Sequence, residues 1–216
     1  MSLIQIAIDG PAGSGKSTIA KKVAKLLDIL YLDTGAMYRA ITLKLINKSI
    51  AFDNIDEISN ILTNTNISFD KKRVLLDGVD VTEEIRMPII DENVSKVASL
   101  KTVRIELVHL QQNIAGTNSI IMDGRDIATR VLPNAEFKFF LTASVDERAK
   151  RRYKERISNG VDVNLESLKE EIISRDKQDT ERVESPLLQA DDALLIDTTG
   201  LSIEGVVNEI LKHVNK

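Results

Sequence analysis

The sequence predicts an α/β protein, in which a parallel sheet is flanked by helices and a small β-containing segment is inserted. Two observations lead to this prediction. Near the start of the chain, short apolar runs alternate with stretches of helical periodicity, in the order strand, helix, strand, helix that is typical of a parallel sheet. Between residues 51 and 87 the pattern changes to short β segments that follow one another closely. The 216 residues suffice for one globular unit that carries such an insert.

The first strand is predicted over residues 3–8, and it ends at Asp9-Gly10. A glycine-rich turn follows, and then apolar residues recur at helical spacing: Ile19, Val23, Ala24, Leu26 and Leu27. Residues 29–32 predict a second strand, and residues 37–46 predict a second helix. These four elements define the parallel part of the fold.

The inserted segment begins with a predicted helix N-cap at Asn54 and Glu57. Residues 67–81 predict a small β meander, and Pro88 with its polar neighbours is expected to return the chain toward the core. A long amphipathic helix is predicted over residues 101–114, ended by residues 116–118, with an apolar face made of Val103, Leu107, Leu110 and Ile114.

Two more core strands are predicted at residues 119–122 and 137–141. Ser144 and Glu147 have capping-box spacing, so a helix is expected to start there and to end at Asn159-Gly160. The remaining predicted elements are a helix over residues 165–175, a strand over 193–196 and a terminal helix over 203–214.

The composition excludes several classes of function. The absence of cysteine excludes disulfides, thiolate zinc sites, iron–sulfur clusters and a cysteine nucleophile, and two histidines make no metal cluster, so any metal must be oxygen-ligated. The net charge of −4, with five Phe, three Tyr and no Trp, argues against a nucleic-acid partner. No apolar run approaches the roughly 18 residues of a membrane span, and the first residues lack a secretory pattern. We expect a cytoplasmic monomer without a membrane partner.

The strongest motif is the phosphate loop of residues 10–17, G-x-x-x-x-G-K-S, which follows a predicted strand and precedes a predicted helix. Its glycines allow backbone N–H groups to point at an anion, Lys16 reaches the β and γ phosphates, and Ser17 can bind Mg²⁺. The same glycines do not form a dinucleotide fingerprint, because Gly15 is followed by Lys-Ser-Thr. The alternative is a glycine-rich turn that only caps a helix. The predicted ATP-binding residues are Gly10, Pro11, Ala12, Gly13, Ser14, Gly15, Lys16, Ser17 and Thr18.

Arginines spread along the sequence help to decide which class of phosphate-loop protein this chain belongs to. The window from Arg148 to Arg156 holds six basic residues and one acid, which gives it a local charge of +5 in an acidic chain. Two phosphorylated substrates repel each other and require several guanidinium groups, whereas a nucleotide-dependent switch does not. A second alternative is another small kinase that acts on a different monophosphate or on a small alcohol, and an alcohol acceptor would need a base such as Asp33 or Asp126. A solvated helix face remains the alternative for any single arginine.

The chain resembles the bacterial cytidylate kinase family along nearly its whole length. The matching segments are IAIDGPAGSGKST, YLDTGAMYRA, IMDGRDIAT with LPNAEFKFFLTAS, RAKRRY, and RDKQDTERVESPL with ADDALLIDT. The resemblance implies a nucleoside monophosphate kinase fold with a parallel five-stranded core (residues 1–50, 99–145 and 180–216). It also implies a nucleotide-binding insert near residues 51–98 and a helical lid near residues 146–179.

The resemblance also implies an activity, namely transfer of the γ-phosphoryl group of ATP, with Mg²⁺, to CMP and dCMP. By motif, the CMP-binding residues are Thr34, Arg39, Ser95, Arg104, Arg125, Asp126, Arg175, Asp179 and Arg182. Ser95, Arg104 and Asp126 suit the cytosine edge, Arg39 and Arg125 the α-phosphate, and Asp179 the ribose. Lys16, Arg125, Arg148 and Arg152 are the expected catalytic residues. Ala128 and Arg130 depart from the family pattern.

Two carboxylates end predicted strands at the edge of the sheet where ligands bind, Asp9 and Asp123. We expect Asp123 to support Mg²⁺ through a bound water. A loop-bracing role is the alternative for both.

Overall fold

A computed structural model describes residues 3–70, 73–158 and 160–215. The chain divides into two compact units. The first unit is formed by the residues up to Leu32 and from Ile114 onward, and the second unit is formed by Asp33–Asn113. Each unit is described by itself below.

The first unit is built on a five-stranded sheet in the order β2-β6-β1-β7-β8. β1 pairs in parallel with both β6 and β7, and β7 pairs in parallel with β8, which confirms the predicted parallel sheet. The strands are β1 (Gln5–Asp9), β2 (Leu30–Asp33), β6 (Ile120–Gly124), β7 (Phe137–Thr142) and β8 (Leu194–Asp197). β1 and β6 read as continuous apolar runs because both of their faces are covered.

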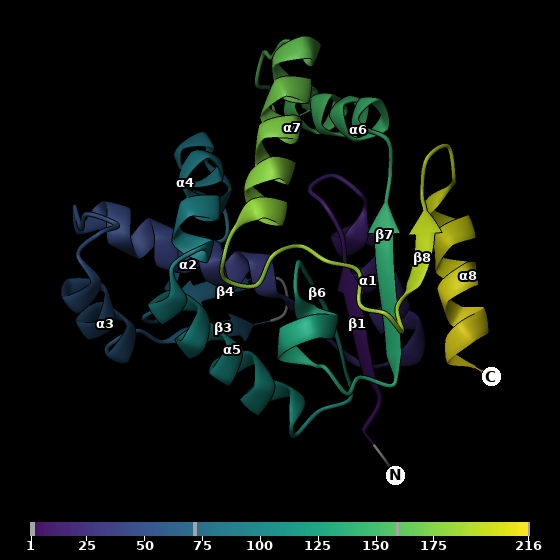
Figure 1. The fold of residues 1–216 in the computed structure, drawn as a ribbon, viewed down its shortest axis with the longest axis horizontal. Coiled ribbons are helices and arrows are strands. Elements are labelled where there is room, and N and C mark those ends of the chain that lie inside the picture. The colour runs from purple at the N-terminus through teal and green to yellow at the C-terminus, as the bar shows by residue number, and fades with distance from the viewer. Residues whose placement is uncertain (1–2, 71–72, 159, 216) are drawn as a thin grey trace. The chain divides into compact units, whose positions relative to one another are not determined.

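Two helices, α1 (Lys16–Leu27) and α8 (Ile203–Val214), pack on the sheet of the first unit (Figure 1). Their apolar stripes form one core with the strands, made of Ile6, Ile8, Ile19, Ala20, Val23, Ala24, Ile121, Phe139, Leu141, Ile196, Val206, Val207 and Ile210. Leu26 was predicted to belong to the apolar stripe of α1, but it is 63% exposed. Its spacing places it on the same side of the helix as Ile19 and Val23, but it lies in the last turn, one residue before α1 ends at Leu27.

The helices α6 (Val145–Ser158) and α7 (Leu165–Glu181) pack against each other in the first unit (Figure 1). Half of the predicted capping box is present, since the amide of Glu147 donates to Ser144 Oγ at 3.2 Å. The Glu147 carboxylate accepts instead from Arg151 at 2.9 Å, and the Ser144 amide donates to Thr199 Oγ1. α7 runs six residues beyond its predicted end at 175. The predicted break at Asn159 lies outside the described residues.

The second unit contains the predicted meander, an antiparallel sheet in the order β3-β4-β5. Its strands are β3 (Ile67–Asp70), β4 (Arg73–Leu76) and β5 (Val79–Asp80). Around them lie α2 (Thr34–Asn47), α3 (Ile55–Thr63), the 3₁₀ turn η1 (Glu84–Arg86), α4 (Pro88–Ala98) and most of α5 (Lys101–Ala115). Asn54 caps α3 as predicted, by accepting from the Glu57 amide at 3.2 Å.

Two predicted elements of this unit are corrected, the start of α2 and the segment after Pro88. α2 begins three residues earlier than predicted, because the Asp33 carboxylate accepts from the Ala36 amide at 2.9 Å and caps the helix. The segment after Pro88 is a helix rather than a return loop, because proline is well suited to a first helical position and Ile90, Val94 and Val97 follow at helical spacing.

The buried face of α5 also differs from the predicted face. Val103 and Leu107 are buried, but Arg104 and Gln111 complete the face, and Leu110 and Ile114 are only partly buried. Part of each buried polar side chain finds a partner, since Arg104 Nη1 donates to Ala98 O at 2.9 Å and Gln111 Nε2 donates to Met37 Sδ at 3.7 Å.

A buried lysine joins α2 to the meander. Lys44 Nζ donates to Asn64 O, Thr65 Oγ1 and Asp77 Oδ2, at 3.0, 2.8 and 2.6 Å. These three acceptors satisfy all three ammonium protons, so the buried charge is fully compensated.

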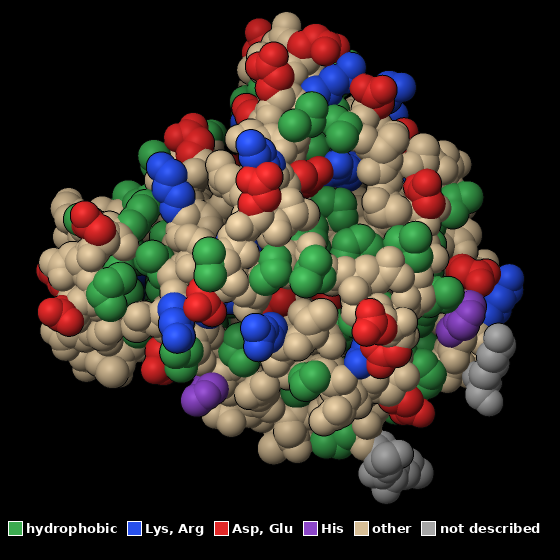
Figure 2. Space-filling model, viewed as in Figure 1, with side chains coloured by type: hydrophobic (Ala, Val, Ile, Leu, Met, Phe, Trp, Pro, Cys, Tyr) green, Lys and Arg blue, Asp and Glu red, His purple; other side chains and the backbone are tan. Residues whose placement is uncertain are grey.

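No helix within the described ranges is long and apolar enough to cross a membrane. Acidic and basic side chains are interspersed on the face of the molecule shown in Figure 2. The compact units do not follow the predicted division into core, insert and lid, because α2 and most of α5 group with residues 51–98. The division into an insert near 51–98 and a lid near 146–179 stays a prediction.

Candidate active site

The glycine-rich turn between β1 and α1 is held tightly against the sheet. Gly10 has φ 146°, and a Cβ atom at this position would lie 1.9 Å from Leu141 O in β7. Only glycine, which has no Cβ atom, allows the backbone at position 10 to lie this close to the backbone of β7. The turn therefore leaves the carboxyl end of β1, at the edge of a parallel sheet where ligands bind.

Three carbonyl groups of this turn are bonded within the first unit. Pro11 O accepts from Lys16 Nζ at 2.7 Å, Ala12 O from Arg148 Nη1 at 3.1 Å, and Ser14 O from Thr198 Oγ1 at 3.1 Å. In a trans peptide the N–H of the next residue points away from the carbonyl. Each of the amides that follow these carbonyls, those of Ala12, Gly13 and Gly15, therefore points away from the partner of the preceding carbonyl, and the loop backbone is held in a fixed conformation.

Lys16 begins α1 and is 5% exposed. Its ammonium donates to Pro11 O and, at 3.4 Å, to Ser14 Oγ. Burial, reinforced by the nearby Arg125 charge, lowers the pKa of Lys16 well below its ordinary value, although Asp123, Asp9 and Asp179 oppose the shift. The loop thus holds a desolvated cation, which gains more from an anionic ligand than an exposed lysine would.

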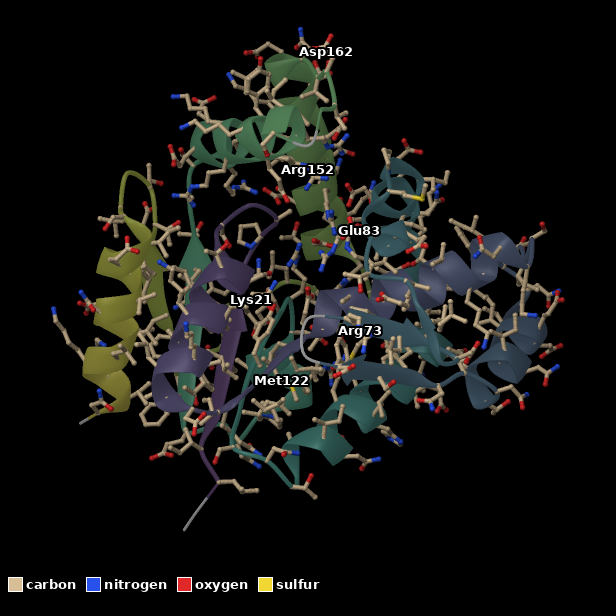
Figure 3. The ribbon with its side chains drawn as sticks, turned by 180° about the vertical axis from the view of Figure 1, so that it is seen from behind. Lys21, Arg73, Glu83, Met122, Arg152 and Asp162 are labelled. Carbon is tan, nitrogen blue, oxygen red and sulfur yellow. The ribbon has the colours of Figure 1, made fainter. Side chains whose placement is uncertain are left out.

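Ser17 and Asp123 meet across the first unit, from α1 and the end of β6. Ser17 Oγ donates to Asp123 Oδ2 at 2.7 Å, and the hydroxyl of Tyr31 donates to Asp123 Oδ1 at 2.7 Å. Lys21, labelled in Figure 3, has its Nζ 5.5 Å from the centroid of the Tyr31 ring. A hydroxyl beside a carboxylate is the hard oxygen donor set that Mg²⁺ prefers, so these residues fit the predicted metal.

Asp9 at the end of β1 braces a neighbouring turn. Its two carboxylate oxygens accept from the amides of Ile127 and Ala128, both at 2.8 Å, at the start of the π-helical turn η2 (Ile127–Val131). Burial raises the pKa of Asp9 to about 7, although the two amide hydrogen bonds oppose the shift. The loop-bracing alternative accounts for this carboxylate.

Among the predicted acceptor residues of the first unit, three side chains come together. Arg125 Nε donates to Asp179 Oδ2 at 2.8 Å, and Arg182 Nη1 lies 3.7 Å from Asp179 Oδ1. Burial alone would raise the pKa of Asp179, but Arg125, Arg175 and Arg182 together lower it below its ordinary value. Asp179 is therefore a buried anion that orients cationic groups.

Asp126 and Arg175 are also in the first unit. Asp126 is 3% exposed and directly precedes η2, and Arg175 lies on α7 four residues before Asp179.

The other predicted acceptor residues lie in the second unit. Arg39 on α2 donates from Nη2 to Asp91 Oδ1 on α4, and from Nη1 to Ile85 O at 3.0 Å. Burial lowers the pKa of Arg39 against the opposing effect of Asp91. The Arg104 guanidinium lies 5.3 Å from the centroid of the Tyr38 ring. Thr34 starts α2, and Ser95 is half-buried on α4.

The two arginines predicted to face the transferring group differ in their surroundings. Arg152 is half-buried on α6 (Figure 3), but Arg148 is 4% exposed and its guanidinium is bonded to Ala143, Ala12 and Asp176. The sequence reasoning missed the partners Tyr31, Asp91, Asp176 and Thr198. Tyr31, Asp176 and Thr198 lie in segments that match the family, YLDTGAMYRA, RDKQDTERVESPL and ADDALLIDT, whereas Asp91 lies in none of them.

Comparison with known proteins decides the family. A family model described as cytidylate kinase matches residues 6–216. The chain belongs to the cytidylate kinase family. Curated relatives named cytidylate kinase include one from Leuconostoc mesenteroides, 54% identical over 97% of this chain and 96% of its own length. Another is from Caldanaerobacter subterraneus, 52% identical over 99% of this chain and 95% of its own length. The protein is therefore a phosphoryl-transferring enzyme, a kinase.

Solved structures resemble this cytidylate kinase family member in fold. A shikimate kinase from Bacteroides thetaiotaomicron gives a TM-score of 0.52 at 12% identity, with 100% of both chains covered. A gluconokinase from Sinorhizobium meliloti gives a TM-score of 0.51 at 13% identity, with 98% of this chain and 91% of its own covered. At these identities the likeness concerns the fold alone, and it confirms the predicted kinase fold.

Proposed function

We propose that this chain transfers the γ-phosphoryl group of ATP to CMP and dCMP, releasing ADP and CDP or dCDP, in pyrimidine nucleotide metabolism. The observation that carries the proposal is the phosphate loop with its Ser17–Asp123 pair, in a chain about half identical to named cytidylate kinases along almost its whole length.

The donor half of the proposal rests on the first unit. The loop amides and the buried Lys16 ammonium bind the phosphates of ATP, and Ser17 would hold Mg²⁺, with Asp123, which accepts from Ser17, supporting the metal through a bound water. A bound Mg²⁺ would supply positive charge that offsets the charge of the phosphates. Tyr31 fixes the Asp123 carboxylate by donating to its other oxygen, so the carboxylate is oriented before any ligand arrives.

The acceptor half rests on arginines. A phosphate monoester has a second pKa near 6 and is largely dianionic at neutral pH, so the acceptor needs charge neutralisation and alignment rather than a base. Arg39 and Arg125 bind the acceptor phosphate, together with Arg175 and Arg182, and Asp179 and Thr34 bind the nucleoside. Arg152 neutralises the transferring group with Lys16.

An alcohol acceptor is disfavoured by the surroundings of Asp33. One oxygen of this carboxylate accepts from the Ala36 amide, and the other accepts from Arg86 Nη2 at 2.7 Å. A carboxylate with both oxygens engaged by a helix cap and an ion pair is poorly placed to remove a proton from a hydroxyl.

A substrate panel tests the proposal. ADP release from ATP and Mg²⁺ is measured with CMP, dCMP, UMP or AMP, and again after Mg²⁺ is removed with EDTA and restored. We expect CMP and dCMP to be used, UMP to be strongly disfavoured and AMP to be worse, with activity lost in EDTA and recovered with Mg²⁺. Phosphorylation of AMP at a rate comparable to CMP would refute the assignment.

Base selection is assigned to Ser95, Arg104 and Asp126. UMP inverts the hydrogen-bonding group at the 4-position, which leaves buried polar groups wrongly paired. Asp126→Ala should therefore reduce use of CMP much more than use of UMP. Asp56→Ala, at an exposed position in α3, is the control and should leave both rates unchanged. An equal loss on both nucleotides would assign Asp126 to catalysis or sugar binding instead.

A further inference from the structure

Arg148 is held on every side by the first unit. Its Nε donates to Ala143 O at 3.0 Å, Nη1 donates to Ala12 O at 3.1 Å and to Asp176 Oδ1 at 3.0 Å, and Nη2 donates to Asp176 Oδ2 at 2.6 Å. A guanidinium has five N–H groups, and four of them are used by these bonds. The side chain is 4% exposed.

The acceptors of Arg148 belong to three different segments. Ala12 is part of the phosphate loop, Asp176 lies on α7, and Ala143 follows β7 directly. The backbone of the loop also lies against Arg148, because a Cβ atom at Gly13 would be 3.1 Å from Arg148 Cβ and 3.4 Å from Arg148 O. Two independent contacts, one through the guanidinium and one through the backbone, thus fix the loop to the start of α6.

We propose that Arg148 is a positioning residue, which with Asp176 couples helix α7 to the phosphate loop, in place of the direct phosphate contact expected from the sequence. A phosphate contact would require the buried Arg148 guanidinium to give up both of its bonds to the Asp176 carboxylate, which is itself only partly exposed, and that would break the ion pair. The coupling links the loop that binds ATP to the helix that carries Arg175 and Asp179. This inference rests on the proposed function of the loop as the ATP site.

The bidentate geometry makes the role specific to arginine. Lysine at position 148 would retain the charge, but one ammonium cannot reproduce two parallel bonds to Asp176 together with bonds to Ala12 and Ala143. Asn at position 176 would retain the shape of the acceptor and remove its charge. In both variants Ala12 O loses a well-oriented partner, so the loop amides are less strictly directed.

A second ion pair between the same two helices provides a matched control. Lys169 Nζ on α7 lies 2.9 Å from Asp146 Oδ1 on α6, and both side chains are more exposed than the Arg148–Asp176 pair. Asp146→Asn therefore removes an α6–α7 ion pair without touching the phosphate loop.

The test compares the full-length wild type with Arg148→Lys, Asp176→Asn and Asp146→Asn. ATP affinity without CMP is measured by calorimetry, KM for each substrate and kcat by ADP release, and Tm by thermal unfolding. We expect Arg148→Lys and Asp176→Asn to weaken ATP binding about tenfold, the change given by ~1.4 kcal/mol of lost coupling. KM for CMP should change much less. A double variant that combines Arg148→Lys with Asp176→Asn should bind ATP no more weakly than Arg148→Lys alone, and Asp146→Asn should bind ATP as wild type does.

Two results would overturn the proposal. If Arg148→Lys lowers kcat strongly at unchanged ATP affinity, Arg148 contacts the transferring group directly. If Asp176→Asn lowers Tm but leaves ATP affinity at the wild-type value, the pair is only structural. Should Arg148→Lys fail to fold, the comparison of Asp176→Asn with Asp146→Asn decides. Because ATP binding is measured alone, a failure of the CMP assignment would appear only in the substrate panel.

Discussion

Replacing Lys16 by Met tests the phosphate loop most directly. Met has a similar length and no charge, so the substitution removes the ammonium while it largely fills the same buried volume. Two effects on stability oppose each other. Pro11 O loses the donor that lies 2.7 Å away, and a buried acceptor left without a hydrogen bond lowers the free energy of unfolding by about 1–3 kcal/mol. The removal of a desolvated cation, whose pKa is lowered by burial, has the opposite sign. We expect the free energy of unfolding to change by no more than about 2 kcal/mol.

The effect on catalysis should be far larger. A unit charge about 4 Å from a phosphoryl oxygen contributes ~4 kcal/mol at an effective dielectric constant near 20. If most of this interaction is made in the transition state, its loss lowers kcat/KM by about 10³-fold. The assay is ADP release at saturating CMP, with urea unfolding of the same sample to establish that the variant is folded.

Lys22→Met is the control for this experiment. Lys22 lies on the same helix, but it is largely exposed, and its Nζ pairs with Glu204 Oε1 at 2.6 Å. Turnover of this variant should equal that of wild type. A folded Lys16→Met protein with turnover within tenfold of wild type would refute the assignment of the loop as the ATP site.

Three further predictions concern single side chains. Arg39→Lys keeps a charge but loses the fork, so KM for CMP should rise while ATP affinity measured without CMP stays constant; equal damage to ATP binding would contradict the placement. Asp179→Asn leaves Arg125 and Arg182 without a buried counterion, and urea unfolding should show a loss of about 3–5 kcal/mol. An unchanged unfolding midpoint would show that this carboxylate is not the counterion. Asp9 has a pKa raised to about 7, so the folded protein binds more protons than the unfolded chain between its ordinary value of 3.8 and 7, and stability falls as pH rises through that window, by up to about 4 kcal/mol. Asp9→Asn should lack this slope; parallel pH profiles of the two proteins would contradict the shift.

The sequence by itself determined the features that depend on neighbouring residues. The parallel strands, the phosphate loop and the terminal helix follow from apolar periodicity and from local backbone geometry, which a short segment carries within itself. The long segments that resemble the cytidylate kinase family added a predicted set of residues that bind the acceptor. The helix of α4 was missed because Pro88 was interpreted as a break, although proline is also a favoured first residue of a helix.

The tertiary structure alone decided which side chains meet. Ser17 and Asp123 are 106 residues apart and form a bond of 2.7 Å, and Arg148 reaches across 136 residues to Ala12. Neither pairing leaves a periodic signal, because each depends on the packing of whole elements and not on the spacing along one of them. The burial of Arg104 and Gln111 on α5, where periodicity predicted Leu110 and Ile114, has the same origin. A buried polar side chain is stable where a distant segment supplies its partner, and only the folded chain brings that partner into place.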